Sequence, residues 1–287
     1  MISIYKKEMR AYFTHMMGYI FLAFMLLIIG TWFVMNNVMS RSPNFHHALS
    51  NATIFFFILI PTLTMRLFSE EARQKTDQLL FTSPLSVLQI VLGKFFAATS
   101  LFILATAISV ILPLMLSRFG ELPVSQITGS YIGFALLGMA CIAVGVFISV
   151  LTDNQIIAAV ITVAAVFVLF IMDTVAVLVP TTAFASLVFV IGVVAAVIAL
   201  WFNATRNIIA TVVVAVLGIA VAGGLYLHNN LFYDGIIVRA LLWFSIFARY
   251  ESFTHGIINI SDIVYFVSFS ALFVYLTVNL IEKRRWR

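Results

Sequence analysis

The sequence that decides the fold is GSYIGFALLGMACIAVGVFISVL, residues 129–151, which holds no charged residue over 23 positions. A helix of about 20 apolar residues crosses the roughly 30 Å hydrocarbon core of a bilayer. Small residues recur in steps of four along it, with Leu137 as an interruption: Gly129, Gly133, Cys141, Gly145 and Ser149. Such a ridge lets helices approach closely in lipid. We therefore expect a transmembrane helix with a tight packing face. The pattern leaves open whether its partner is the same chain or a second copy, and packing within the chain is the simpler expectation.

Composition extends this reading to the whole chain. Of 287 residues, 63% are hydrophobic and 9% are charged, whereas soluble proteins average about 45–50% and about 25%. The charged residues cluster between long uncharged stretches, so most of the chain must face lipid. The one cysteine, Cys141, excludes a disulfide framework, and the pattern predicts no metal site. The net charge of +5 forms no basic stripe, which argues against a nucleic-acid partner.

The expected fold is all-α, a polytopic transmembrane helical bundle of about eight spans. The expected spans are residues 18–38, 49–67, 95–117, 129–151, 155–179, 182–202, 206–227 and 262–281. Only a short connection joins residues 182–202 to residues 206–227, so either segment could be partly re-entrant. A bundle of six spans is therefore the alternative.

The distribution of Lys and Arg predicts the orientation of the bundle. With the N-terminus in the cytoplasm, twelve of the sixteen basic residues lie inside. The four that lie outside are Arg41, Arg118, Arg239 and Arg249. Because cytoplasmic loops carry the excess of positive charge, we expect both termini in the cytoplasm.

Residues 1–17 are expected to form an amphipathic helix along the cytoplasmic membrane surface, ahead of a transmembrane domain over residues 18–287. Apolar side chains recur there at three- and four-residue steps: Ile2, Tyr5, Met9, Tyr12, Phe13 and Met16. A basic start before an apolar run is also similar to a signal peptide. Residues 18–38 are too long for that and lack a small-residue cleavage site, so we expect the first span to be retained.

Residues 68–94 form the one substantial cytoplasmic loop, and their pattern predicts two helices. Ser69 is a candidate N-cap, with Glu70 and Glu71 in the first turn, where negative charge complements the unpaired backbone amides. The first helix is expected to run from there through Leu80. Pro84 predicts a break and a second helix that begins there, capped by Ser83. A soluble partner could bind a short polar helix of this kind, and a solvated connector is the alternative.

Residues 229–257 are expected to form short helices in the outer leaflet. They mix apolar side chains with Asp234, Arg239, Arg249 and Glu251, and the run between Arg239 and Arg249 is too short to cross. Ser261 and Asp262 are expected to cap the final helix.

The stretch RLFSEEAR, residues 66–73, followed by TDQLLFTSPLS, residues 76–86, closely resembles a loop of type-2 ATP-binding-cassette (ABC) permeases. The most similar branch is the gliding-motility and nitrous-oxide-reductase-maturation type. Further agreement lies in residues 4–8 with 18–20, in 151–155, and in 251–258 with 262–265 and 282–286. The resemblance is faint over residues 180–235.

This resemblance implies a type-2 ABC exporter fold whose loop carries a coupling helix that docks on an ATPase subunit. The docking positions it implies are Glu70, Glu71, Arg73, Thr76, Asp77 and Leu80. The family pattern has a glycine before the threonine, where this chain has Lys75. The implied partners are two ATPase subunits that hold ATP and Mg²⁺ and a second permease subunit, identical or related. An extracytoplasmic accessory protein could join them. The implied location is the bacterial plasma membrane, with multiple passes.

The chain lacks the residues of an ATPase. Its only Gly–Lys step is Gly93–Lys94, and Leu88 stands where a GxxxxGK motif needs its first glycine. We therefore expect no enzyme activity and no cofactor in this chain. Asp173, the one carboxylate within an apolar run, is a candidate for the substrate path. Counting from Asp153 at about 1.5 Å per residue places it near the outer interface, where a structural role is the favoured reading.

Three functions follow as hypotheses. The favoured one is the permease subunit of an ATP-driven ABC transporter, working as an exporter. An ion-coupled secondary carrier is the second, but it needs midplane ionisable groups that the spans lack apart from Asp173. The third is a membrane scaffold that transmits ATPase motion to an outer partner without transport.

Overall fold

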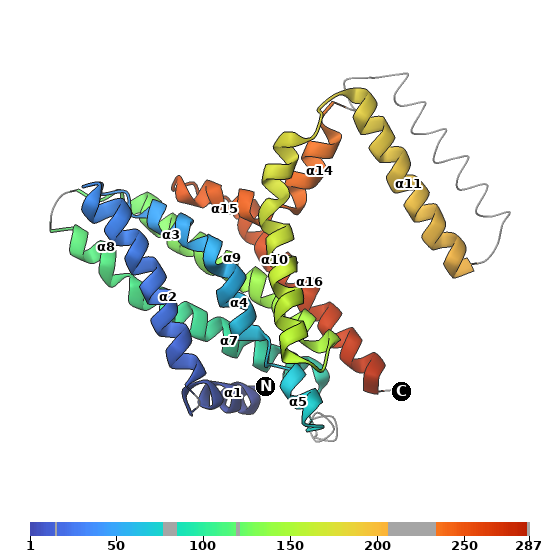
Figure 1. The fold of residues 1–287 in the computed structure, drawn as a ribbon, viewed down its shortest axis with the longest axis horizontal. Helices are drawn as coiled ribbons and strands as arrows, with labels where there is room; N and C mark the ends of the chain where they lie inside the picture. Colours follow the sequence, from blue (N-terminus) through green and yellow to red (C-terminus); the bar gives the residue numbers. More distant parts are fainter. Residues whose placement is uncertain (15, 77–84, 119–120, 206–233, 286–287) are drawn as a thin grey trace. The chain divides into compact units, whose positions relative to one another are not determined.

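The computed structural model describes residues 1–14, 16–76, 85–118, 121–205 and 234–285, and every regular element in these ranges is helical (Figure 1). The all-α expectation is therefore confirmed. The chain forms two compact units, one of Met1–Leu169 with Ile246–Arg287 and one of Phe170–Ser245.

The first unit contains most of the helices. They are α1 (Ile2–Thr14), α2 (Met17–Phe33), α3 (His46–Ala52), α4 (Phe56–Thr64), α5 (Ser69–Arg73), α7 (Val87–Ser109), α8 (Ile111–Leu116), α9 (Val124–Leu151), the larger part of α10 (Gln155–Leu178), α15 (Ile246–Thr254) and α16 (Ile260–Arg285). A π-helical turn, Val34–Met39, extends α2, and a 3₁₀ turn, Thr53–Phe55, joins α3 to α4. The second unit holds the end of α10, α11 (Ala183–Thr205) and α14 (Ile236–Phe244).

Six helical segments of the described residues are long and apolar enough to cross a membrane. They are Met17–Met39, His46–Arg73, Val87–Leu116, Val124–Leu151, Gln155–Leu178 and Ile260–Arg284. Each overlaps one of the expected spans. The expected span 182–202 coincides with α11, and the expected span 206–227 lies outside the described residues. The total of eight spans stays a prediction.

The third span begins earlier than the hydropathy pattern indicates. We expected it at residue 95, but α7 begins at Val87, where the Ser86 side chain accepts a hydrogen bond from the Gln89 amide at 3.3 Å. The helix therefore contains Lys94, which we had placed in the loop. The expected helix start at Pro84, with its cap Ser83, lies outside the described residues.

The small-residue ridge of α9 packs against helices of the same chain. A Cβ atom at Gly133 would lie 2.6 Å from the Phe253 side chain of α15, and one at Gly145 would lie 2.3 Å from Thr64 of α4. Gly129 also faces Phe253, through its carbonyl oxygen. The expectation of packing within the chain is confirmed, and it places α9 in the middle of the first unit.

Three buried phenylalanines form the centre of this packing. The ring centroids of Phe56, Phe102 and Phe134 lie 5.1–5.6 Å apart. Gly138 of α9 leaves the space that the Phe102 ring fills. Aromatic pairs at these separations contribute beyond the area that they bury.

Two short helices, α14 and α15, lie within residues 229–257, where the sequence pattern predicted short helices. α14 belongs to the second unit and α15 to the first, while residues 229–233 lie outside the described residues. Their placement in the outer leaflet stays a prediction.

Asp262 differs from the expectation that it caps the last helix. α16 begins two residues earlier, at Ile260. The Asp262 carboxylate instead forms an ion pair with Arg249 at 3.0 Å and accepts a hydrogen bond from the side-chain amide of Asn259 at 3.3 Å. The Arg249 guanidinium also lies 3.9 Å from the centre of the Tyr265 ring. The charge of Asp262 therefore joins α15 to α16 rather than closing a helix end.

Replacing Gly138 by alanine should destabilise the first unit, because the new Cβ atom would lie 2.2 Å from the Phe102 ring. Overpacking of this kind costs about 1–3 kcal/mol. We expect purified Gly138→Ala to unfold at a lower SDS concentration than the original protein. Gly30→Ala in α2 is the matched control, since no described atom outside its own stretch of helix lies within 4 Å of its Cβ position. Equal SDS resistance of the two variants would contradict the packing.

Candidate functional site

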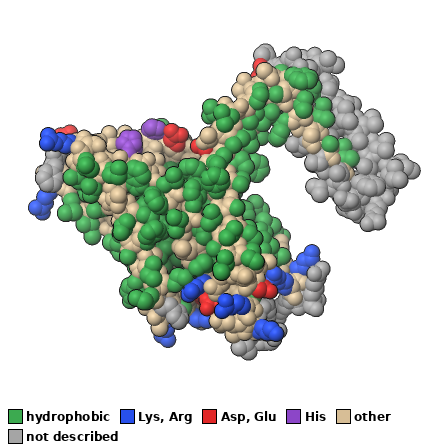
Figure 2. Space-filling model, viewed as in Figure 1, with side chains coloured by type: hydrophobic (Ala, Val, Ile, Leu, Met, Phe, Trp, Pro, Cys, Tyr) green, Lys and Arg blue, Asp and Glu red, His purple; other side chains and the backbone are tan. Residues whose placement is uncertain are grey.

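Figure 1 shows α1, α5 and both chain termini at one end of the first unit. Figure 2 shows a group of Lys and Arg side chains on the lower part of the same view. Ion pairs connect the segments there: Lys7 of α1 lies 2.9 Å from Glu71 of α5, and Arg284 of α16 lies 3.7 Å from Asp153. This end is the one that the basic residues assign to the cytoplasm.

Helix α1 lies against α7 through Ile4, which the sequence did not single out, and through Tyr5 of the expected stripe, whose hydroxyl donates to Ser100 at 3.1 Å. Ile4 is buried, and its side chain occupies the space above Gly93. The Tyr12 hydroxyl donates to the Leu63 carbonyl at 3.0 Å, and burial together with the charge of Glu8 raises the pKa of Tyr12. Ile2, from the expected membrane-facing stripe, is 68% exposed. Placement of α1 along the membrane surface stays a prediction.

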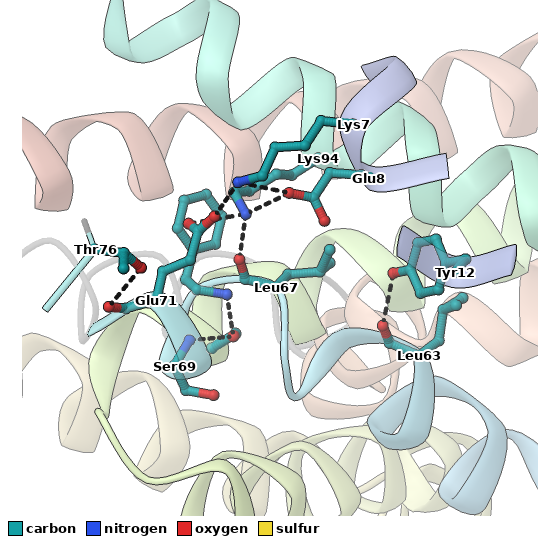
Figure 3. A network of polar contacts seen from close by, with 11 residues as sticks. Lys7, Glu8, Tyr12, Leu63, Leu67, Ser69, Glu71, Thr76 and Lys94 are labelled. Carbon is teal, nitrogen blue, oxygen red and sulfur yellow. Dashed lines mark hydrogen bonds and ion pairs between the residues drawn. The ribbon is translucent and has the colours of Figure 1, made fainter. Parts of the chain in front are cut away.

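Lys94 is the centre of the polar contacts at this end. Its side chain is 1% exposed, and its Nζ atom lies 2.9 Å from Glu8 Oε1 and 2.9 Å from Glu71 Oε2. The same atom donates to the Leu67 carbonyl at 2.5 Å and lies 5.0 Å from the centre of the Phe68 ring. Figure 3 shows these groups converging from α1, α5 and α7. The buried ammonium group of Lys94 is therefore surrounded by two carboxylates, one carbonyl and one aromatic ring.

Glu71 connects this lysine to a second one. Its Oε1 atom accepts a hydrogen bond from Lys7 at 2.9 Å, while its Oε2 atom pairs with Lys94. Partial burial lowers the pKa of Lys7, but the hydrogen bond and charge of Glu71, with the charge of Glu8, raise it overall. Two lysines and two glutamates thus alternate in one network, and we call Lys7, Glu8, Glu71 and Lys94 the lysine–glutamate network.

The first turn of α5 obtains its cap from another helix. We expected Ser69 to be the cap, but the N-cap position is Phe68 and the Ser69 hydroxyl donates to the Met65 carbonyl. Ser149 of α9 accepts hydrogen bonds from the amides of Phe68 and Ser69 at 3.1 and 3.3 Å. These amides would otherwise be among the unpaired donors of the helix start. The cap therefore fixes α5 to the central helix.

The end of α5 explains the glycine that the resembled family carries. Lys75 has a φ of 57°, in the left-handed region. The Lys75 amide donates to the Ala72 carbonyl at 3.1 Å and the Thr76 amide to the Glu71 carbonyl at 3.0 Å. This is the Schellman pattern, in which the left-handed residue is usually glycine. A turn that glycine usually occupies is therefore present here, with a lysine in the strained position.

The predicted docking residues differ in where they lie. Glu71 points into the lysine–glutamate network and its side chain is 14% exposed. Glu70 is partly exposed and lies 4.0 Å from Arg66, and Arg73 is exposed. Thr76 donates weakly to the Glu71 carbonyl at 3.4 Å. Asp77 and Leu80 lie outside the described residues.

Arg73 borders an open hollow at the same end. The hollow measures about 580 Å³, and its other walls come from the connection between α9 and α10: Thr152, Asp153, Asn154, Gln155 and Ile156. Within this connection the Asn154 side chain accepts a hydrogen bond from the Ile156 amide at 2.9 Å and so caps α10. Two of the stretches that carry the family resemblance therefore share one hollow.

Asp173 lies far along α10 from this end and belongs to the second unit. No described residue forms a hydrogen bond with its Oδ1 atom. Its candidacy for the substrate path stays a prediction. Among the described residues, no group of three His, Cys, Asp or Glu side chains could hold a metal ion.

The fold and this site together define a class: an integral membrane protein with several apolar helices and a short polar helix anchored at one end of the bundle. Comparison with protein families then gives the particular one. Residues 10–170 match the family described as ABC-2 family transporter protein, and this is more than half of the chain. The chain belongs to that family. No curated protein matches it closely enough to count as a relative.

Sequence reasoning missed the lysine–glutamate network. We placed Lys94 at the end of the cytoplasmic loop and assigned no contact to Glu8. One signal was present, because apolar residues continue on both sides of Lys94. A charge inside such a run needs a partner, and Glu8 and Glu71 are the nearest acidic residues of neighbouring segments.

Replacing Lys94 by methionine should destabilise the first unit strongly, because two partly buried carboxylates, Glu8 and Glu71, would lose their shared buried cation. Removing one partner of a buried ion pair costs about 3–5 kcal/mol. We expect Lys94→Met to unfold at a much lower SDS concentration, and Lys94→Met with Glu8→Gln to recover part of the loss. Lys6→Met is the control, since Lys6 is exposed on the same end. If Lys94→Met and Lys6→Met unfold at the same SDS concentration, the lysine–glutamate network does not stabilise the first unit.

Replacing Lys75 by glycine should stabilise the end of α5. A side chain in the left-handed conformation costs roughly 1 kcal/mol, which glycine avoids. Hydrogen–deuterium exchange of the amides of residues 72–76 should therefore slow severalfold. Gln74→Gly is the matched control and should speed exchange, because Gln74 has a right-handed φ of −82°. Faster exchange in Lys75→Gly would contradict the assigned turn.

Proposed function

We propose that this chain is a permease subunit that a separate ATPase subunit drives through α5. Membership of the ABC-2 family implies partnership with an ABC ATPase and favours this function over an ion-coupled carrier. The observation that carries the proposal is the anchoring of α5. A helix of five residues is too short to be stable alone, yet this one is held by the lysine–glutamate network on one side and by Ser149 on the other.

An anchored helix of this kind suits a coupling element. When an ATPase closes on ATP, a displacement of α5 would be passed to α1, α7 and α9 because each is bonded to it or to the residues beside it. Interfaces of this type shift between discrete packings as rigid bodies. The energy would come from the difference in ATPase binding between the two packings.

The anchoring also divides the predicted docking residues into two roles. We propose that Glu71 holds α5 in place, whereas Glu70 and Arg73 face the ATPase subunit. Exposed charges suit this second role, because complementary charges steer a partner and fix its register. The hollow beside Arg73 adds a concave surface of about 580 Å³ for a partner side chain.

The remaining parts of the proposal rest on the family resemblance. We propose two ATPase subunits that carry ATP and Mg²⁺, a second permease subunit and an export direction. We also propose the bacterial plasma membrane as the location and the gliding-motility or nitrous-oxide-reductase-maturation type as the branch. An accessory protein on the outer side would suit the short helices α14 and α15.

Reversing the charge of Arg73 should weaken docking without unfolding the chain. We expect Arg73→Glu, alone or with Glu70→Lys, to reduce co-purification of the co-expressed ABC ATPase at least about tenfold, which corresponds to about 1.4 kcal/mol. Stimulation of ATP hydrolysis by the permease should fall in parallel. The variant should still insert and elute as the original protein does, because Arg73 is exposed.

Arg118→Glu is the matched control, since Arg118 is exposed in the connection after α8. Full binding and full stimulation in Arg73→Glu with Glu70→Lys would contradict docking on this face. A complex that hydrolyses ATP in vesicles but moves no solute would instead favour the scaffold hypothesis. Reversal of Glu71 is a poor test, because it would break the lysine–glutamate network as well.

A further inference from the structure

A cavity lies between α1, α4, the start of α5 and α7, beside the lysine–glutamate network. Its volume is about 510 Å³, within the range of small-molecule sites, about 300–1,000 Å³. Its charged lining consists of three basic and three acidic side chains: Lys7, Arg66, Lys94, Glu8, Glu70 and Glu71. The cavity is therefore polar but carries no formal net charge.

Two of these charges are not committed to the network. Lys7 and Lys94 are paired with Glu8 and Glu71 at 2.9 Å. Arg66 has a long contact with Glu70, 4.0 Å from Nε to Oε2, and Glu70 Oε1 accepts one hydrogen bond, at 3.3 Å from the exposed Gln74 side chain. The Arg66 and Glu70 side chains are 45% and 35% exposed. The cavity thus offers one guanidinium and one carboxylate side by side, each with room for a further partner.

An apolar groove continues from this cavity along the membrane span. It measures about 240 Å³, and its walls are Ile20, Phe21 and Phe24 of α2 and Leu59 of α4. Both spaces share four lining residues: Tyr12, Met17, Thr62 and Leu63. Ile20 is 59% exposed, so the groove opens toward the surface that faces lipid.

We infer that the cavity and the groove together bind one membrane phospholipid with a zwitterionic headgroup and a primary ammonium group, that is, a phosphatidylethanolamine. The phosphate would bind the Arg66 guanidinium, which matches phosphate geometry well. The ammonium group would donate to Glu70, and an acyl chain would lie along Ile20, Phe24 and Leu59. This site shares Glu70 with the proposed docking surface, but lipid binding there does not depend on ATP-driven transport.

Charge selects this lipid among the common ones. An anionic headgroup would bring an uncompensated negative charge to a cavity with three carboxylates. A choline headgroup has no N–H to donate, whereas a primary ammonium group can form charge-assisted hydrogen bonds with a carboxylate. The guanidinium of Arg66 and the carboxylate of Glu70 are complementary in charge to the phosphate and the ammonium group of phosphatidylethanolamine.

Such a lipid would contact helices that the lysine–glutamate network also joins, and α4 and α2 beside them. Its headgroup would touch the segment between α4 and α5, and its chain would touch α2 and α4 near Tyr12 of α1. A bound lipid would therefore stabilise α1 against α4, as any ligand that binds only the folded state does.

Native mass spectrometry of the full chain in detergent tests the inference directly. We expect one palmitoyl-oleoyl phosphatidylethanolamine to bind more tightly than the phosphatidylcholine or phosphatidylglycerol with the same acyl chains. Arg66→Gln should weaken its binding about tenfold, the equivalent of one charge-assisted hydrogen bond. Thr62→Phe, which fills the junction of the two spaces, should abolish this specific adduct.

Two matched controls separate the site from general lipid contact. Arg118→Gln removes an exposed arginine elsewhere, and Ile58→Phe enlarges an exposed residue one turn before Thr62 on α4. Both should bind the lipid as the original protein does. Equal binding of the three lipids, a preference for phosphatidylglycerol, or unchanged binding in Arg66→Gln and Thr62→Phe would each overturn the inference. Arg66 is exposed, so Arg66→Gln remains informative even if Thr62→Phe fails to fold.

Discussion

The buried ammonium group of Lys94 is the interaction on which this end of the structure depends. A charge removed from water is costly unless it is paired and hydrogen-bonded, and Lys94 obtains two carboxylates, one carbonyl and one aromatic ring. These partners come from α1, the segment before α5, and α5 itself. Satisfying one cation therefore fixes three segments of the chain to α7.

The central helix α9 provides the second constraint. Its glycines allow α4 and α15 to approach within contact of its backbone, and its Ser149 supplies the hydrogen bonds that the first turn of α5 lacks. Both effects come from the same ridge of small residues. The ridge thus serves helix packing over most of its length and the anchoring of α5 at its last member.

The sequence predicted the parts of the structure that depend on local pattern. Apolar runs of about 20 residues located the spans, and the acidic residues after Ser69 located the start of α5. The expected helix ran through Leu80, but α5 ends at Arg73 because Lys75 takes a left-handed conformation, so the expected length was wrong. The ridge predicted the packing face of α9. Long-range pairing was not predictable in this way, because nothing local shows that Lys94 meets Glu8, 86 residues away. Hydropathy alone counts a lysine as the end of a span, and only its partners reveal that the helix continues around it.

The same distinction holds for the candidate site. Family resemblance placed Glu70, Glu71 and Arg73 in one group, but the helix turns Glu71 toward the lysines and leaves Arg73 exposed. The missing glycine looked like a departure from the family turn. The backbone of Lys75 shows that the turn is kept and that the side chain tolerates the left-handed conformation. Backbone geometry can thus persist where the residue type that usually marks it is absent.

The central claim is that α1 and α5 move as one body when an ATPase subunit acts on the chain. The most direct test measures the distance between spin labels at positions 6 and 74 of one chain, in the assembled complex in lipid. These positions are exposed on α1 and at the end of α5. The account predicts the same distance distribution with and without ATP. A shift or broadening of that distribution on ATP binding would show that α5 moves independently and would contradict it.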